Sequence, residues 1–399
     1  MNAVAETIAD GPLPSARSAV GTAAAFSIRV VDDVAAVRDD WLALEAEVPL
    51  SGYQRLAWQD TFQRHLAEGA DACIAVIADS AGRTQALLPF AVVRRRGLAI
   101  AAFIGGKHAN FAMGLWRPAF ARTLGAEDLA AAFRAIAARS PHPIDLFELT
   151  NQPVSWAGFA NPLALLPHRP SPSFGYHLAL GPDGDAVFER VVSSSSRRKL
   201  RKKERNLAEI GPVSFTVAAD EAAIARFTDA FLAYKAARFA ELGIPNVFDV
   251  PGMRDFIIEA ASGAAPAIEL CALKVGDEIV AMFGGCIANG RYSAMFNAMA
   301  PGDVQHESPG ELVLHHLIRH CCARGLDVFD LGAGEAEYKS HICDGVDPLF
   351  DQSIAVTWKG ALAARAFALL GTLKRSAKQS AWLWPLIVRI RRLRARIAA

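Results

Sequence analysis

The feature that most constrains the fold is a pattern of one helix and three strands that occurs twice along the chain. In the first copy, the pattern predicts a helix over 58–68 followed by strands over 73–78, 86–93 and 98–104. The second copy starts about 195 residues later, with a helix over 253–261 and strands over 269–274, 278–288 and 291–298. Asn289-Gly290 joins the last two of these strands, and Asn-Gly is the strongest two-residue hairpin signal. We therefore predict two related α/β units.

Each copy continues into one more helix and one more strand. The helix over 126–138 and the strand over 143–149 extend the first copy, while a helix starting at Ser308 and a strand over 326–331 extend the second. The segment 161–172 is rich in proline and is the best candidate for a linker. We expect an N-terminal unit over 26–175 and a C-terminal unit over 176–358.

The two ends of the chain differ in charge. Residues 1–25 contain Glu6 and Asp10 and lack the basic start and apolar core of a signal peptide, so we expect a flexible tail. Residues 359–399 carry ten Lys or Arg and no Asp or Glu, which leaves 32 basic and 41 acidic residues in 1–358, a net charge of −9. In that basic tail, one helical face would hold Trp382, Leu386, Ile390, Leu393 and Ile397, and another Arg389, Arg392 and Arg396. The tail is expected either to contact anionic lipid or to dock on the acidic body.

The cysteines indicate a reducing compartment. Six cysteines stand at irregular positions, with none of the C-x2-C pairs of structural zinc sites. Adjacent cysteines at 321–322 and the His-x-Cys at 341–343 do not match ligand spacings either, so no metal is expected. No segment has the roughly 18 apolar residues that span a bilayer. We expect a cytoplasmic protein, with peripheral contact at the inner face of the cell membrane if the tail binds lipid.

Residues 305–339 contain the best candidate for a chemical site. Ser308 and Glu311 match a capping box with Pro309 at the first helical position, so a helix is predicted to begin there. Its free N–H groups would suit a phosphate, although an ordinary capped helix explains the same pattern. The strand then runs into Asp330-Leu-Gly-Ala-Gly334, which is similar to a methyltransferase glycine turn. Only 65 residues follow Gly334, too few for the sheet that such an enzyme places after this turn.

A basic run, RRKLRKKER over 197–205, holds seven cations in nine residues. Leu200, Leu207 and Ile210 recur at helical spacing and Ser196 is placed to cap, which predicts a helix with a solvated basic face. The same run would also serve to bind the phosphates of a coenzyme or a tRNA. No aromatic residues that could stack bases are interleaved with it, so DNA binding is not expected.

Taken in order, these residues resemble the GNAT acyltransferase superfamily, and within it the CelD-like proteins of bacterial polysaccharide synthesis, which are relatives of the FemAB peptidyltransferases. The likeness covers roughly 26–358. In the first unit it rests on Trp41-Leu-Ala-Leu44, Trp58, Ala86-Leu-Leu-Pro89 and Phe103-Ile-Gly-Gly106. In the second it rests on 197–207, Ser308-Pro-Gly310 and the stretch from Phe329-Asp-Leu-Gly332 to Tyr338-Lys339. The resemblance implies two tandem GNAT-like units, each a mixed, mostly antiparallel sheet flanked by helices.

The resemblance also implies a coenzyme site. GNAT enzymes cradle the coenzyme A pyrophosphate on a Q/R-x-x-G-x-G/A turn, which reads Gln305-x-x-Ser308-x-Gly310 in this chain, so Ser308 replaces the first glycine. The phosphates would meet the N–H groups of Gly310 and Glu311 and the Ser308 hydroxyl. The backbone of Asn297 and Ala298 would pair with the pantetheine amides. The co-substrate would be acetyl-CoA or a longer acyl-CoA.

Each demand of acyl transfer to an amine has a candidate residue. Glu335 would take the proton of the amine, Tyr338 would protonate the leaving thiolate, and Lys339 would stabilise the oxyanion. Asp330 is a second candidate base or a buried structural acceptor. The alternative is that Glu335 and Lys339 form an i,i+4 surface ion pair and that Tyr338 is a core aromatic.

The leading expectation is an acyl-CoA-dependent N-acyltransferase, acting on a small amine or an amino sugar in envelope polysaccharide synthesis; the pathway comes from the resemblance. Two alternatives remain open. One is a FemAB-like transferase that takes an aminoacyl group from tRNA, which the basic run would bind. The other is a catalytically silent GNAT scaffold at the membrane.

Overall fold

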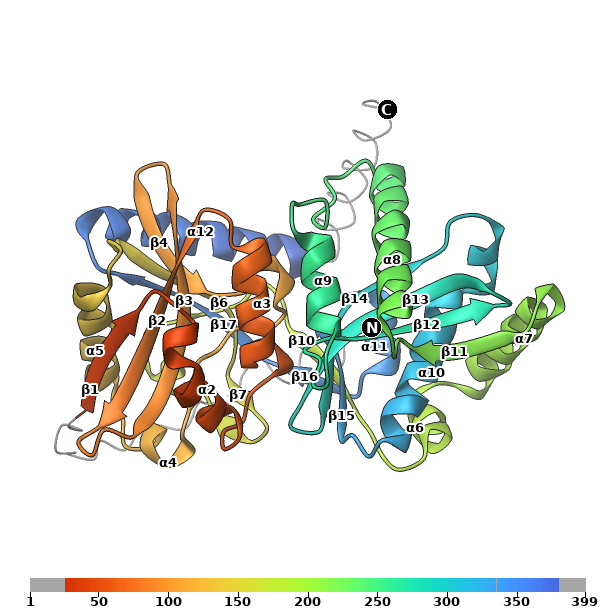
Figure 1. The fold of residues 1–399 in the computed structure, drawn as a ribbon, viewed down its shortest axis with the longest axis horizontal. Helices are drawn as coiled ribbons and strands as arrows, with labels where there is room; N and C mark the ends of the chain where they lie inside the picture. The colour runs from red at the N-terminus through yellow and green to blue at the C-terminus, as the bar shows by residue number, and fades with distance from the viewer. Residues whose placement is uncertain (1–25, 335, 380–399) are drawn as a thin grey trace.

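The computed structural model describes residues 26–334 and 336–379, which form two α/β units placed side by side (Figure 1). The first unit contains, in chain order, β1 (Phe26–Val31), η1 (Ala35–Val37), α2 (Arg38–Glu45), η2 (Gly52–Gln54), α3 (Leu56–Leu66), β2 (Ala70–Asp79), β3 (Thr84–Arg95), β4 (Leu98–Phe103), η3 (Gly106–His108), β5 (Leu115–Trp116), α4 (Pro118–Ala121), α5 (Ala126–Arg139), β6 (Leu146–Pro153), β7 (Ser155–Trp156), β8 (Phe159–Ala160), η4 (Pro162–Leu165) and β9 (Arg169–Pro170).

The second half of the chain contains β10 (Gly175–Ala179), α6 (Gly184–Val191), α7 (Ser194–Ile210), β11 (Val213–Val217), α8 (Glu221–Leu242), α9 (Met253–Ala261), β12 (Glu269–Val275), β13 (Glu278–Ala288), β14 (Arg291–Met299), η5 (Asp303–Glu307), α10 (Pro309–Ala323), β15 (Val328–Ala333), α11 (Glu337–Ile342), β16 (Gly345–Asp347), β17 (Leu349–Ala355) and α12 (Trp358–Gln379). Within these described residues, no helix has the length and apolarity needed to cross a membrane.

The main sheets of the two units confirm the predicted fold class. The first has the strand order β1-β2-β3-β4-β6-β17-β9 with β5 beside β3, and the second has the order β11-β12-β13-β14-β15-β10-β16. Most neighbours are antiparallel, while β4–β6 and β14–β15 are parallel. The predicted hairpin between β13 and β14 is present, with Asn289 and Gly290 both at positive φ (47° and 70°) as a tight turn of this kind requires.

The two units exchange their closing strands. β10 follows the first unit in the chain but pairs antiparallel with β15 in the second sheet, whereas β17 follows the second unit and pairs antiparallel with β6 in the first. Residues 349–358 were expected in the second unit. They lie on the first instead, because β17 pairs in the first sheet and α12 packs on β17 and β6. β17 covers an edge of β6 that would otherwise expose unpaired backbone.

The proline-rich segment 161–172, predicted as a linker, instead forms secondary structure on the first unit. Residues Pro162–Leu165 form η4, and Arg169–Pro170 form β9 against Phe350 and Asp351 of β17. The amide of Gln352 donates to the carbonyl of Leu163 (2.8 Å), which holds the segment on the first unit.

A shared aromatic core joins the units. The matching helices α3 and α9 of the two copies pack on each other, as the centre of Figure 1 shows. Trp58 stacks on Phe62 (ring centroids 5.1 Å apart), and Phe256 of α9 meets both rings edge-on at 5.7 and 5.8 Å. All three side chains are buried in one hydrophobic cluster that spans both units. The units are thus expected to unfold together rather than separately.

The contact between the two units, which we call the seam, leaves no room for a side chain at Gly52. A Cβ built there would lie 2.5 Å from the Cβ and Sγ of Cys286 on β13. We expect Gly52→Ala to lower the free energy of unfolding by about 1 to 3 kcal/mol through overpacking. The matched control is Gly181→Ala, whose Cβ would meet only Val187 at 3.9 Å. Denaturant unfolding measures both variants, and equal stabilities would contradict this account of the seam.

Candidate active site

A cavity of about 970 Å³ opens in the second unit, where the end of β14, the starts of α7 and α10, and α11 meet. It is lined by Val191, Val192, Ser193, Ser196, Phe283, Asn297, Ala298, Met299, Gln305, Ser308, Gly310, Glu311, Leu314, Tyr338, His341 and Ile342. The set includes all six residues predicted to bind the coenzyme, together with Tyr338. The structure therefore brings these residues to one place, and their roles stay predictions.

The cavity exists because β14 and β15 separate. The parallel pairing joins Arg291–Ser293 to Val328–Asp330 and stops there. Beyond it, within the described part of the chain, the Asn297–Ala298 backbone pairs only with Phe283 and Met282 of β13 on its other side. The cavity side of β14 is thus an open strand edge, which can accept an extended ligand carrying amide groups.

The start of α10 differs from the predicted capping box. Ser308 adopts a left-handed conformation (φ 50°, ψ 52°), so its side chain does not cap the helix. Its Oγ instead accepts a hydrogen bond from Lys203 of α7, and the N–H of Glu311 bonds to the Ser308 carbonyl (3.0 Å). The box prediction was wrong because a capping side chain needs an extended backbone at this position. The left-handed conformation is one that glycine adopts more readily, and glycine is the residue that the GNAT turn has here.

A second helix start faces the same cavity. Ser193 caps α7 by accepting a hydrogen bond from the N–H of Ser196 (3.2 Å), and both serines line the cavity. The cap is therefore Ser193 and not the predicted Ser196. Lys203 and Asn206 then fasten α7 to the segment before α10, with the Asn206 amide donating to Glu307 (3.1 Å). Two helix N-termini, each with a partial positive charge, converge on one space and favour an anion there.

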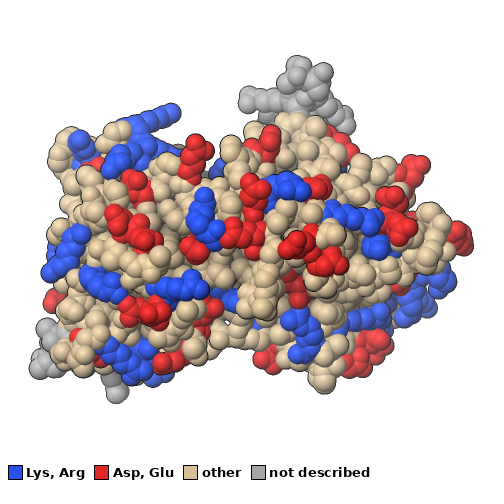
Figure 2. All heavy atoms as spheres, in the orientation of Figure 1, with Lys and Arg blue, Asp and Glu red and all other residues tan. Residues whose placement is uncertain are grey.

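The basic run forms the exposed face of α7, as predicted. Arg198, Lys199, Arg201, Lys202 and Arg205 are exposed along the helix. Figure 2 shows basic side chains gathered at the end of the molecule where Figure 1 places α7. A positive surface therefore adjoins the cavity mouth formed by the first turn of this helix.

Tyr338 borders the cavity from α11 and is 42% exposed, so it is not a core aromatic. Partial burial raises the pKa of its hydroxyl, and a side-chain hydrogen bond with Asn297 opposes part of that rise. The hydroxyl therefore keeps its proton at neutral pH and is able to donate it. Glu335, the predicted base, lies outside the described residues.

Lys339 does not line the cavity. Its side chain is buried, and the ammonium donates to the carbonyls of Gly332 (3.1 Å) and Ala333 (3.3 Å) and lies 5.7 Å from the centre of the Tyr176 ring. In this structure Lys339 holds the turn between β15 and α11, which differs from the expected place beside an oxyanion.

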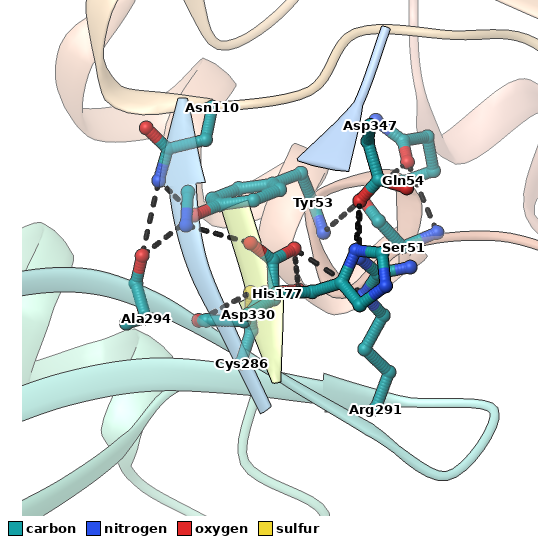
Figure 3. Close-up of polar contacts among 12 residues, drawn as sticks. Ser51, Tyr53, Gln54, Asn110, His177, Cys286, Arg291, Ala294, Asp330 and Asp347 are labelled. Carbon is teal, nitrogen blue, oxygen red and sulfur yellow. Dashed lines mark hydrogen bonds and ion pairs between the residues drawn. The ribbon is translucent and has the colours of Figure 1, made fainter. Parts of the chain in front are cut away.

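Asp330 is also outside the cavity lining, in a polar cluster at the seam (Figure 3). The carboxylate has no exposed surface, accepts the N–H of Gly332 (2.6 Å) and lies 3.3 Å from Nε of Arg291. Arg291 also donates to Asp347 (2.7 Å), and Asp347 pairs with His177 (2.9 Å). Burial raises the pKa of Asp330 to about 6. This arrangement matches the structural-acceptor alternative for Asp330.

Comparisons with known proteins agree with the fold and place a family match in the second unit. Residues 194–340 match the family model of the acetyltransferase (GNAT) domain. The second unit contains a GNAT acetyltransferase domain. Over 80% of this chain and 96% of that one, the fold is similar to that of FemX, with a TM-score of 0.56 at 9% identity.

Two further structures share the fold. One is the C-terminal domain (DUF2156) of a protein described as a lysylphosphatidylglycerol synthetase from Agrobacterium fabrum, with a TM-score of 0.50 at 10% identity, over 86% of this chain and 96% of that one. The other is a conserved protein from Bacteroides thetaiotaomicron, with a TM-score of 0.50 at 13% identity, over 82% and 99%. No curated protein matches the sequence. The predicted fold of two GNAT-like units is confirmed, and these identities extend the likeness no further than the fold.

Part of the cavity wall was not predicted from the sequence. Val191, Val192 and Ser193 come from the end of α6 and the turn into α7. The run of four serines before the basic run was the available signal for a helix start there. Lys203 carries no local signal, because its partner Ser308 is 105 residues away. Among the residues that the structure describes, no cluster of His, Cys, Asp and Glu is arranged to hold a metal ion.

The buried carboxyl at the seam predicts a pH dependence of stability. An unfolded aspartate titrates near pH 3.9, whereas folded Asp330 titrates at about 6, so the folded state holds the extra proton between these values. The contribution of Asp330 to stability therefore falls as pH rises from about 4 to 6. The stability of Asp330→Asn relative to wild type should rise by roughly 2 kcal/mol between pH 4.5 and 7.

Denaturant unfolding at the two pH values measures this change. Asp145→Asn is the control, because the hydrogen bonds of Asp145 to Thr357 and Ala99 lower the pKa of its carboxyl, and both states are then ionised over most of this range. A relative stability of Asp330→Asn that does not change with pH would contradict the raised pKa.

Proposed function

We propose that the chain is an acyl-CoA-dependent N-acyltransferase whose acceptor is a small amine or an amino sugar. The observation that carries the proposal is that one cavity combines an open strand edge, two helix N-termini and a protonated tyrosine. An acyl-CoA presents the matching groups, namely two amides in its pantetheine arm, a pyrophosphate and a thioester. We place the enzyme in the cytoplasm, and the role in envelope polysaccharide synthesis is the extension that the CelD-like motifs favour.

The pyrophosphate would lie against the start of α10. Pro309 has no N–H, and the Glu311 N–H is already bonded to Ser308, so the Gly310 N–H is the donor left in the first turn among the described residues. The Ser193 end of α7 adds a second positive pole. The pantetheine amides would pair with the backbone edge at Asn297 and Ala298.

The reaction needs one bond made and one broken. The amine nitrogen attacks the thioester carbonyl, the C–N bond forms, and the C–S bond breaks to release the coenzyme thiolate. Tyr338 is placed at the cavity to give its proton to that thiolate, and Glu335 is our candidate to take the proton that the amine loses. Lys339 acts indirectly by holding the turn that precedes α11.

A second candidate function is transfer of an aminoacyl group from tRNA. The five exposed cations of α7 beside the cavity favour it, because such a surface attracts a nucleic-acid backbone. The two functions differ in the donor and share the cavity and the amine acceptor.

Calorimetric titration with coenzyme A, acetyl-CoA and a longer acyl-CoA tests the donor. A Cβ on Gly310 would meet Met299 Sδ at an ordinary 3.6 Å, so Gly310→Ala should bind normally, whereas Gly310→Phe should fill the phosphate end and weaken binding by about tenfold or more. Wild-type protein that binds no coenzyme would overturn the proposal. Binding of aminoacyl-tRNA, lost when the α7 cations are replaced, would then identify the second candidate, and no donor at all would indicate a silent scaffold.

Removing one hydroxyl tests the proton donor. We expect Tyr338→Phe to lower kcat by about 100-fold or more while coenzyme affinity stays within about twofold, because general acid catalysis contributes at that level. Steady-state kinetics and calorimetry separate the two effects. Tyr234→Phe is the control, since the Tyr234 hydroxyl bonds to the Ile279 carbonyl (2.6 Å) and does not line the cavity. Wild-type turnover in Tyr338→Phe would remove Tyr338 from the mechanism.

A further inference from the structure

The outer face of α12 is apolar where a surface helix ordinarily carries polar side chains. Four exposed large apolar residues of the helix share this face: Trp358 is 71% exposed, Leu362 57%, Leu369 62% and Leu373 57%. With 3.6 residues per turn, these four positions fall within about 60° of one another around the helix axis. We call them the α12 stripe. A continuous row of this kind differs from scattered apolar residues and marks a contact surface.

The opposite face of α12 is fixed to the first unit, so the helix cannot turn to bury the stripe. At Gly360 a Cβ would collide with the Asp145 carbonyl oxygen, which shows how closely the helix backbone approaches β6. The Thr357 hydroxyl, just before the helix, donates to the Asp145 carboxylate (2.6 Å). Near the other end, Arg375 donates to the Ser171 carbonyl (2.6 Å) and lies 5.7 Å from the centre of the Phe174 ring.

The charged residues of α12 itself all have one sign. Asp351 is the last acidic residue of the chain, and residues 359–399 carry ten cations. By helical position, Arg365 lies on one side of the stripe and Lys359 on the other. Leucines and a tryptophan along one line with cations on both sides are the composition of helices that lie in the interface of an anionic bilayer. A flat bilayer also accepts a convex helix without needing a complementary groove.

We propose that α12 docks this protein on an anionic lipid surface. The α12 stripe enters the boundary between headgroups and acyl chains, and the flanking cations meet the lipid phosphates. This proposal is independent of the acyl-transfer proposal, because the stripe lies on the first unit and shares no residue with the cavity.

Sedimentation of the full-length protein with lipid vesicles tests the docking. Vesicles of phosphatidylcholine mixed with phosphatidylglycerol should bind the wild type, binding should weaken as salt rises, and vesicles of phosphatidylcholine alone should bind less. The variant Leu369→Asp/Leu373→Asp should bind at least about tenfold more weakly. Because both side chains are exposed, its melting temperature should stay close to that of the wild type.

The control carries the same added charge away from the stripe. Leu42→Asp/Ile210→Asp replaces two apolar residues that are 44% and 73% exposed on α2 and α7, and it should bind within about twofold of wild type. Wild type that stays in the supernatant with anionic vesicles at low salt would overturn the proposal. So would equal binding of the stripe variant. A dimer that the stripe variant abolishes, without vesicle binding by the wild type, would assign the stripe to a contact between copies and would also overturn it.

Discussion

The exchange of β10 and β17 is the constraint on which the rest of this structure depends. β10 follows β9 in the chain and yet pairs in the second sheet, whereas β17 follows β16 and yet pairs in the first. The pairing of β10 with both β15 and β16 brings His177 to Asp347 and, through Arg291, to Asp330. A buried charge without a partner is costly, so these contacts depend on the position of β10 in the second sheet.

The same seam positions the cavity. Asp330 bonds to the N–H of Gly332, and the Gly332 carbonyl accepts Lys339, so a chain of hydrogen bonds runs from the buried cluster to α11, which carries Tyr338. Asn110 of the first unit packs so closely on Gly332 that a Cβ there would overlap its amide. The first unit therefore supports the turn that leads to the cavity of the second, although it contributes no residue to the cavity lining.

Local patterns predicted what depends on local chemistry. The helices and hairpins of both copies, the basic helix and the gathering of Asn297, Gln305 and Gly310 follow from periodicity, turn residues and the resemblance to GNAT proteins. The strand exchange was not predictable, because β17 and β6 are about 200 residues apart and either sheet edge suits the same apolar strand. The burial of Lys339 was missed for a similar reason, since its partners are carbonyls of a glycine turn, which no side-chain pattern reveals.

The ends of β6 and β15 differ in a way that helps to explain how the second unit forms its cavity. β15 includes Gly332 and is followed by Gly334, both at positive φ (72° and 103°), and the chain then turns toward α11. β6 has Thr150-Asn-Gln152 at the matching place and continues to Pro153, because the Gln152 amide bonds to Gln352 (3.0 Å) and the Asn151 N–H bonds to Asp351 (3.0 Å) of β17. Turning there would break these buried hydrogen bonds. β17 thus pairs along the end of β6 in the first unit, whereas the glycine turn after β15 leads into α11, which borders the cavity of the second unit.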